Sequence, residues 1–430
     1  MRRLDASEPG FAAEFDALVN DRRESTSDVS ADVAAIIARV KAEGDAALAD
    51  YTAKFDRFDL GASGWSISKE DCAAAYEALA PDLRDALNLA ADRIRAYHAA
   101  QLPEDRDYRD ATGARLGARW NAVDAAGVYV PGGRAAYPSS VLMNILPAKV
   151  AGVERIVMMT PTPGGETNQV VMAAAHVGGV DEIWRIGGAQ AVAALAYGTD
   201  KIAPVDVVTG PGNAWVAEAK RQVYGVVGID MVAGPSEIVV VADNRNAPHV
   251  IAADLLSQAE HDPTSQSILF TDDAAFADAV AEAVDAIIPT LGTAATMRTS
   301  WADNGAVIIV PTLADAIPLC DRLAPEHLEL AVDAAEADAL FAKVRHAGSV
   351  FLGRQTPEAI GDYVAGPNHV LPTGRRARFS SGLSVSDFMK RTSFLALDET
   401  SLAAIGPAAV ALAGAEGLPA HALSVSQRLS

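Results

Sequence analysis

The feature that most constrains this chain is a regular alternation of short β-branched runs with helical patterns, beginning near residue 127. Strands that alternate with helices form parallel sheets with right-handed crossover connections. So many runs predict two sheets, with the Gly-Pro-Ser turn at 234–236 as the crossing point between them. The predicted strands are 127–130, 155–159, 182–186, 206–209, 237–242, 267–271, 306–310 and 349–352.

The two ends of the chain have a different texture. Before about residue 125 the pattern is mostly helical, with apolar residues at helical spacing in 27–55 and 69–100. Ser27 and Asp28 are available as N-caps of the first helix. From residue 381 onward β-branched runs are scarce, and we expect a short helical arm that reaches a neighbouring subunit. Its helical patterns are 383–391 and 401–413.

Charge and composition exclude several classes of protein. The 430 residues carry a net charge of −21, which repels nucleic acid and anionic membranes, so neither is an expected partner. No apolar run of about 18 residues predicts a transmembrane helix, and no apolar segment follows the first two arginines as a secretory signal requires. The only two cysteines, Cys72 and Cys320, lie in helical contexts typical of core residues, although a disulfide or redox pair is an alternative. We therefore expect a cytoplasmic protein.

A glycine-rich turn at 210–213 follows one predicted strand and opens a helix over 214–223. Open α/β sheets bind ligands at such turns, and free N–H groups at a helix start can hold a phosphate. The G-x-G-x-x-G fingerprint is absent, because Trp215 stands at its third glycine position. Tight-turn structure and nucleotide contact are therefore equal interpretations of this turn.

Four clusters combine a histidine with an acid or an amide. Gln258 and His261 are three residues apart, so they share one helical face and both can reach one ion. Histidine and carboxylate are common zinc ligands, whereas a glutamine oxygen is a weak donor that leaves the metal electron-poor. A polar helix end is the alternative for this cluster.

The second cluster is Glu326-His327, a pair suited to stepwise proton transfer, with a helix N-terminus as the alternative. Asp362 and His369 lie on a glycine-rich loop, where residues held by a rigid sheet often carry function. The tail supplies a fourth cluster that contains His421. Four such clusters indicate one composite metal site.

Many separate segments, in order from about residue 20 to the C-terminus, resemble the histidinol dehydrogenase family. The matching strings are VYVPGG (128–133), GGAQAVAALAYGT (187–199), GPGNAWVAEAKRQV (210–223), AGPSEIVVVAD (233–243), QAEHD (258–262), APEHLEL (324–330), GDYVAGPNHVLPT (361–373), SGLSVSDFMKR (381–391) and AEGLPAH (415–421).

The resemblance implies an enzyme that oxidises L-histidinol to L-histidine through L-histidinal in two successive NAD-dependent hydride transfers. It implies one zinc ion per subunit in a homodimer with shared active sites, the tail being swapped between subunits. The implied base is His327, and Glu326 is the group that activates water for the second oxidation. The implied zinc ligands are Gln258, His261, Asp362 and His421, the last from the partner subunit.

The same resemblance assigns the binding residues and the domains. NAD contacts are expected at Tyr129, Gln190 and Asn213, and substrate contacts at Ser236, Gln258, His261, His327, Asp362, His369, Glu416 and His421. The expected fold is α/β, with two Rossmann-like parallel-sheet domains, a helical N-terminal segment and a small helical, domain-swapped tail. Expected borders are 1–20 for the N-terminal segment, 21–127 with 239–380 for the first domain, 128–238 for the NAD-side domain, and 381–430 for the tail.

Three other functions compete with this interpretation. A related zinc-dependent alcohol dehydrogenase could act on another small polar alcohol, such as a sulfonated propanediol, but Glu416 and His369 favour an imidazole substrate. A zinc hydrolase would leave the glycine-rich turns unexplained. A non-catalytic zinc and nucleotide sensor would have no need of both Glu326 and His327.

Overall fold

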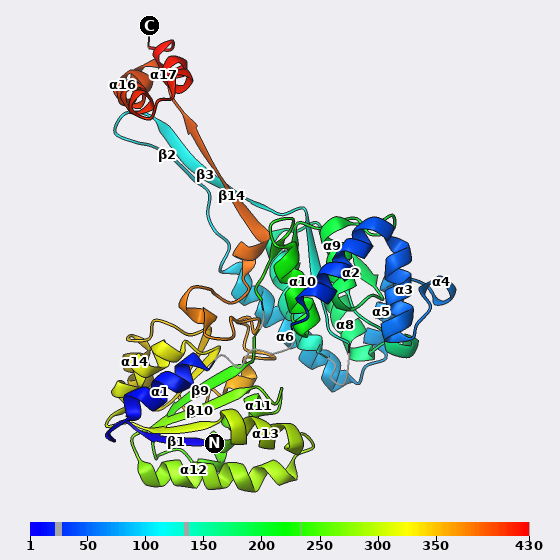
Figure 1. Cartoon of the computed structure of the whole chain (residues 1–430), viewed down its shortest axis with the longest axis vertical. Coiled ribbons are helices and arrows are strands. Elements are labelled where there is room, and N and C mark those ends of the chain that lie inside the picture. The colour runs from blue at the N-terminus through cyan, green and yellow to red at the C-terminus, as the bar shows by residue number, and fades with distance from the viewer. Residues whose placement is uncertain (22–27, 133–136, 233, 430) are drawn as a thin grey trace.

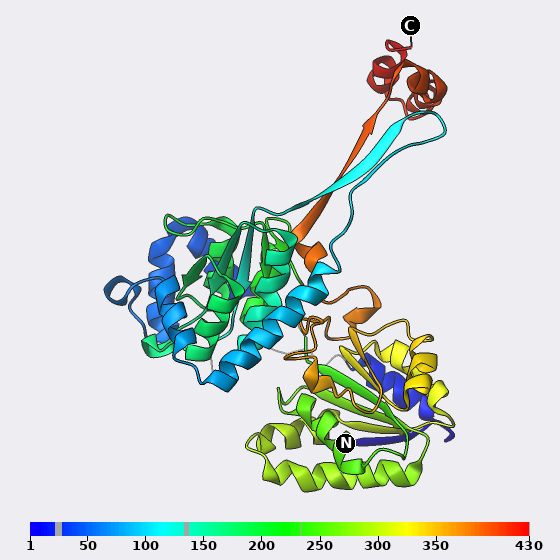
Figure 2. The ribbon, with the colours of Figure 1, turned by 180° about the vertical axis from the view of Figure 1, so that it is seen from behind.

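The structure, a computed structural model, describes residues 1–21, 28–132, 137–232 and 234–429. Two α/β lobes lie side by side, and a long arm projects from them and carries the C-terminus (Figures 1 and 2). Each lobe is a parallel sheet covered by helices on both faces. Among the helices described, none combines the length and apolar character that a bilayer crossing needs.

One lobe is built on a six-stranded sheet whose paired neighbours are all parallel. Its strands, in spatial order, are β1 (Arg2–Asp5), β11 (Ala306–Ile309), β10 (Gln266–Thr271), β9 (Glu237–Ala242), β12 (His327–Ala331) and β13 (Ser349–Leu352). The central strands are rich in Val, Ile and Leu because both of their faces are buried. One face packs against α1 (Phe11–Asn20), α14 (Leu313–Leu323) and α15 (Ala334–Phe341). The other packs against α11 (Pro248–Ala259), α12 (Ala274–Ile287) and α13 (Ala294–Asn304).

The second lobe is built on a five-stranded parallel sheet. Its spatial order is β6 (Glu182–Trp184), β5 (Arg155–Met159), β4 (Ala125–Tyr129), β7 (Val207–Thr209) and β8 (Gly228–Ile229). One face packs against α5 (Lys69–Glu77), α6 (Pro81–Ala99), α7 (Pro138–Ala151) and α8 (Gln169–Gly178). The other packs against α2 (Ser30–Glu43), α3 (Asp45–Asp56), α4 (Leu60–Ser63), α9 (Gly188–Tyr197) and α10 (Ala214–Val223).

Apart from β1, which is added at the edge of the six-stranded sheet, strand order is the same in the two sheets. The first of the remaining five strands is central in each sheet, β4 between β5 and β7, and β9 between β10 and β12. The direction of winding therefore reverses beside β4 and beside β9, which makes these positions the switch points of two Rossmann-like sheets.

The arm is a three-stranded antiparallel sheet with helices at its tip (Figures 1 and 2). Its strands are β14 (Met389–Ala396), β3 (Arg115–Ala122) and β2 (Arg106–Arg109). The tip consists of α16 (Glu399–Ala415) and α17 (Pro419–Ser426). Short 3-10 turns are η1 (Pro163–Gly165), η2 (Ile288–Thr290), η3 (Glu358–Ile360), η4 (Arg376–Arg378) and η5 (Val385–Phe388).

The α/β class, the parallel sheets and all eight predicted strands are confirmed, with ends shifted by up to two residues. The turn at 234–236 does join the two sheets, although residue 233 lies outside the described part. The N-cap of α2 is Val29, without a side-chain cap hydrogen bond, so Asp28 is not the cap; it accepts instead from the Ser30 N–H, and Ser27 lies outside the described residues.

Several helical predictions are wrong because strand pairing overrides local pattern. Residues 106–122 form β2 and β3 rather than helix, and 389–396 form β14, which pairs with β3 along its whole length. The N-terminal segment begins with a strand, β1, that extends the six-stranded sheet. His327 begins strand β12, so its pattern is not that of a helix start.

Helix packing also differs from the predicted grouping of 21–127 with 239–380. Helices α2 to α6 cover the five-stranded sheet formed by residues 125–229, and β1 and α1 belong with the six-stranded sheet. Apolar periodicity indicates that a helix buries one face, but it does not indicate which sheet that face will cover.

Candidate active site

The candidate catalytic residues gather at the amino ends of β9 and β12. His327 is the first residue of β12, which is paired in parallel with β9, and Glu326 precedes it. Gln258 lies in the last turn of α11, and His261 follows that helix. Asp362 lies on the loop after η3. Ligands of open α/β sheets usually bind at the carboxyl ends of the strands, whereas this candidate site lies at their amino ends.

His327 is held by contacts on both ring nitrogens. Its Nδ1 lies 2.8 Å from Gln258 Oε1 and 3.2 Å from the main-chain oxygen of Glu237. Both neighbours are acceptors, so Nδ1 carries the proton of the neutral ring and Nε2 has the free lone pair. Nε2 faces Glu358 Oε1 at 3.4 Å. Burial lowers the pKa of His327 to about 4, which keeps the ring neutral and able to accept a proton near pH 7.

Carboxylates surround this imidazole. Glu326 Oε2 is 3.9 Å from His327 Nδ1 and accepts a hydrogen bond from the Glu237 N–H at 3.1 Å. Burial raises the pKa of Glu326 well above its usual range. Burial also raises the pKa of Glu358 to about 8, and the charge of Asp362 adds to this effect. A buried carboxyl group with a raised pKa is suited to acid–base chemistry.

The predicted metal ligands adjoin the same imidazole. Gln258 Nε2 lies 3.3 Å from His261 Nδ1, while its Oε1 faces His327. Donor atoms of His327, Glu358 and Asp362 lie within 4.8 Å of one another. Imidazole nitrogen and carboxylate oxygen are ordinary zinc donors, so the chemistry of the set suits this metal. Gln258 is fully buried whereas His261 is exposed, so the cluster opens to the surface on the side of His261.

The loop that carries Asp362 and His369 is anchored to the second lobe. His369 Nδ1 is 3.0 Å from the main-chain oxygen of Asp362, and its Nε2 is 3.5 Å from Ser140 Oγ on α7. Although burial would raise the pKa of Asp362, the hydrogen bond and charge of His369 bring it below its usual value. Arg93 of α6 also donates to the main-chain oxygens of Val364 and Ala365.

Three groups in this site were missed from the sequence. Glu358 has no neighbouring histidine, and its only signal is a position four residues before Asp362. Its Oε1 atom is buried and has no hydrogen-bond partner among the described residues. Ser140 carries no sequence signal, and the contacts of Glu237 are made by its main chain, which no residue pattern reveals.

The predicted NAD residues occupy the carboxyl ends of the five-stranded sheet. The Gly188 N–H donates to the hydroxyl of Tyr129 at 3.1 Å, and Gln190 lies two residues further along α9. Asn213 caps α10 by accepting from the Trp215 and Val216 N–H groups. Two parallel-sheet turns and a helix start thus converge beside the β4–β7 switch point, which suits a dinucleotide.

A buried ion pair fixes the glycine-rich turn of this sheet. Lys220 pairs with Asp230, and both reach Gly210: the ammonium donates to its carbonyl at 2.9 Å, and the carboxylate accepts from its N–H at 2.9 Å. A Cβ at position 210 would lie 2.1 Å from the Tyr129 oxygen, and φ is +113°, so only glycine fits here.

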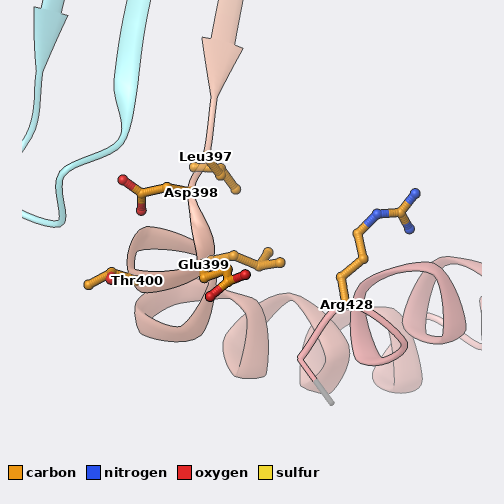
Figure 3. A pocket seen from close by; sticks show the side chains of 6 residues that line it. Leu397, Asp398, Glu399, Thr400 and Arg428 are labelled. Carbon is orange, nitrogen blue, oxygen red and sulfur yellow. The ribbon is translucent and has the colours of Figure 1, made fainter.

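The remaining predicted substrate residues do not lie close together within this chain. Ser236 directly precedes β9 and is half-buried next to Glu237, whose main chain contacts both Glu326 and His327. Glu416 and His421 are exposed on the arm tip, and the arm carries them away from both lobes (Figures 1 and 2). A pocket at that tip is lined by Leu397, Asp398, Glu399, Thr400, Leu402 and Arg428 (Figure 3), and it shares no residue with the candidate site.

Two Rossmann-like lobes, with a buried Glu326–His327 pair and a cluster of nitrogen and oxygen donor atoms, are typical of an α/β enzyme. The sequence matches the histidinol dehydrogenase family over residues 19–429. The chain belongs to this family of oxidoreductases of histidine biosynthesis.

Individual relatives agree with this assignment. The chain is 65% identical over 428 residues to the histidinol dehydrogenase of Zymomonas mobilis, covering 100% of this chain and 99% of the relative. It is 61% identical over 429 residues to that of Rhodospirillum rubrum, covering 100% and 98%. The crystal structure of histidinol dehydrogenase from Elizabethkingia anophelis is similar with a TM-score of 0.94 at 34% identity, covering 100% of this chain and 98% of that chain.

Proposed function

We propose that this enzyme oxidises L-histidinol to L-histidine through L-histidinal, using two molecules of NAD in succession and one zinc ion per subunit. The observation that carries the proposal is the contact between Gln258 and His327, which joins a metal donor to a buried neutral imidazole beside Glu326. Alcohol oxidation needs such a base, because the hydroxyl proton must leave as the hydride departs. NAD, when bound, accepts the hydride.

His327 is the proposed base of the first oxidation. Its Nδ1 proton is held by Gln258 and by the main chain of Glu237, so the ring cannot rotate without losing both contacts. Nε2, which carries the free lone pair, is then the atom that takes the hydroxyl proton. A neutral ring at the working pH is required for that role, and burial provides it.

Glu326 is the proposed group that activates water for the second oxidation. The hydrated aldehyde forms when water adds to histidinal, and a carboxylate within the site can take the proton from that water. Burial raises the pKa of Glu326, which makes its carboxylate a stronger base. The Glu237 N–H fixes one carboxylate oxygen and thereby orients the group.

Zinc is the proposed metal, held by Gln258, His261 and Asp362 together with His421 of the partner subunit. A zinc ion held by these residues would supply a Lewis acid for nitrogen donors of the substrate and would thereby help to orient its alcohol carbon. The exposure of His261 supports a fourth ligand that arrives from outside the chain. The remaining substrate contacts are proposed at Ser236, His327, His369 and Glu416.

A second copy of this chain is the proposed partner of the arm. The arm exposes apolar side chains that a lone subunit would leave in water, among them Leu395 at 69%, Leu412 at 66% and Leu423 at 55%. A swapped arm in a homodimer would bury these residues and bring His421 and Glu416 to the neighbouring site. The pocket of Figure 3 lies on the same tip and would adjoin that interface.

NAD is proposed to bind at the carboxyl ends of the five-stranded sheet, in contact with Tyr129, Gln190 and Asn213. The β4–β7 switch point supports this position, because dinucleotides bind where strand order reverses. Both cysteines, Cys72 and Cys320, are buried free thiols, which fits a reducing compartment, and we propose a cytoplasmic enzyme.

The test of substrate compares kcat/KM for L-histidinol with that for a sulfonated propanediol, using NAD and zinc-loaded enzyme. We expect at least a hundredfold preference for histidinol, because a site built to bind an imidazole leaves polar groups unpaired with other alcohols, a difference of about 3 kcal/mol. A preference for the sulfonated alcohol would transfer the proposal to that reaction. Omission of NAD should abolish product, which separates the oxidation from a zinc-dependent hydrolysis.

A further inference from the structure

The main chain of Glu237 contacts both members of the proposed acid–base pair. Its N–H donates to Glu326 Oε2 at 3.1 Å, and its carbonyl oxygen lies 3.2 Å from His327 Nδ1. Glu237 is the first residue of β9 and therefore lies at the amino end of this strand. A small displacement of this one residue would therefore move the partners of both groups.

The side chain of Glu237 is in turn held by Arg375. Arg375 Nη1 lies 3.1 Å from Glu237 Oε1, and Nη2 donates to Gln266 Oε1 at 2.7 Å. Gln266 is the register partner of Glu237 on β10, so one guanidinium links the amino ends of two neighbouring strands. Nη2 also reaches the carbonyl of Leu18 on α1 at 3.4 Å. Both charged side chains are buried, with Arg375 only 4% and Glu237 only 1% exposed.

Stability alone does not account for this arrangement. Arg375 adopts φ +66°, a left-handed conformation that is unfavourable for a residue with a Cβ atom. A buried ion pair loses hydration, and an apolar pair of similar volume is often at least as stable. Two unfavourable features at one buried position therefore favour a role in geometry.

We propose that Arg375 is a positioning residue, which acts through Glu237 to hold Glu326 and His327 in one fixed arrangement. This inference rests on the catalytic roles proposed above for these two residues. Because Glu237 contacts both groups, loss of the Arg375 guanidinium slows both oxidation steps. In contrast, a change at Glu326 or at His327 affects mainly the step in which that group acts.

The experiment measures the two half-reactions separately in Arg375→Met and Arg375→Lys enzymes. The first step is followed with histidinol in a single turnover, and the second with supplied histidinal. For Arg375→Met we expect kcat to fall about tenfold to a hundredfold in both steps, because misplacement by about 1 Å costs that much. KM and bound zinc should stay near the wild-type values, and Arg375→Lys should recover part of the rate.

The matched control is Arg354→Met, at the other end of β9. Arg354 pairs with Asp243, the residue that follows β9, through two contacts of 2.6 Å, so this is also an arginine–carboxylate pair at an end of that strand. We expect this variant to lower thermal stability without changing either half-reaction. Equal rate loss in the control, or slowing of only one step in Arg375→Met, would overturn the positioning role.

Glu237→Gln serves as a second variant should Arg375→Met not fold. It preserves the main chain and the side-chain shape but removes the charge that faces Arg375, so both steps should again slow together. Hydrogen exchange of the Glu237 amide gives a readout independent of activity, and we expect faster exchange in this variant; wild-type exchange together with wild-type rates contradicts the proposal. If His327→Asn and Glu326→Gln enzymes keep their turnover, the proposed catalytic roles fail. The exchange rate of the amide at position 237, compared between the wild-type and Glu237→Gln proteins, still tests the positioning.

Discussion

Gln258 Oε1 lies 2.8 Å from His327 Nδ1, so one amide connects the proposed zinc ligands with the proposed base. The other end of that amide contacts His261, another proposed ligand, at 3.3 Å. The orientation of the base and the integrity of the metal site are therefore coupled through a single side chain. This coupling makes the separate contributions of metal and base testable with substitutions that spare one of them.

Replacement of His327 by Asn should leave zinc bound but block the first oxidation. The Asn amide can still donate toward Gln258, but nothing replaces the Nε2 lone pair that takes the hydroxyl proton. We expect kcat to fall by about 10²–10⁴-fold, the usual contribution of a general base. Zinc content by atomic absorption is the control, and near-normal turnover with histidinol would rule out the role.

Replacement of Glu326 by Gln should spare the formation or binding of histidinal but slow its oxidation. The amide keeps the shape of the side chain, yet it cannot take a proton from water. We expect the rate with supplied histidinal to fall about 10²-fold or more, while the first hydride transfer changes much less. Single-turnover absorbance of NADH measures both steps, and equal slowing of the two would argue against a role confined to water.

Replacement of His421 by Ala should weaken zinc binding, although His421 lies on the arm and far along the chain from Gln258. Mixed dimers of His421→Ala and Gln258→Ala chains should recover partial activity, because one of the two shared sites then receives only intact ligands. The homodimer of each variant is the control. Activity that mixing never restores would show that the arm does not complete the site.

Half-buried Asp254 and buried Glu329 form a carboxyl pair near the site, and a substitution here should change stability in a pH-dependent way. Burial raises the pKa of Asp254 to about 6, and burial together with the charge of Asp254 raises that of Glu329. A folded state with raised carboxyl pKa values binds protons more tightly than the unfolded state. The free energy of unfolding therefore falls as pH rises from about 4 through about 6.

Asp254→Asn removes one ionisable group of this pair, so the variant should lose less stability as pH rises. We expect its free energy of unfolding, relative to wild type, to increase by about 2 kcal/mol between acidic and neutral pH. Urea unfolding of the zinc-free proteins at equal concentration measures this difference. If the free energies of unfolding of the wild-type and Asp254→Asn proteins change in parallel with pH, the raised pKa of Asp254 would be contradicted.

The parallel sheets were predictable because buried strands such as 237–242 and 267–271 are continuous apolar runs between turn residues. The arm was not, since β14 is a strand only by virtue of its pairing with β3, whose residues lie 267 to 281 positions earlier. Strand β12 was also missed, because its buried acid Glu329 interrupts the apolar run.

The contacts of the candidate site were likewise predictable only in part. Gln258 and His261 were brought together by helical spacing, and they do lie in contact. Their approach to His327 depends on the pairing of β9 with β12 and on the packing of α11, which local pattern does not contain. Glu358 was missed for the same reason, because only the folded loop directs its carboxylate at His327.

The most direct test of the account is the amount of NADH formed when limiting L-histidinol is added to purified enzyme with excess NAD, before and after treatment with a chelator. We expect about two NADH per histidinol, one for each hydride transfer, with loss of activity in the chelator and recovery on addition of zinc. One NADH per histidinol would contradict the second oxidation. Full activity in metal-free enzyme would contradict the zinc site, and no NADH at all would refute the proposed reaction.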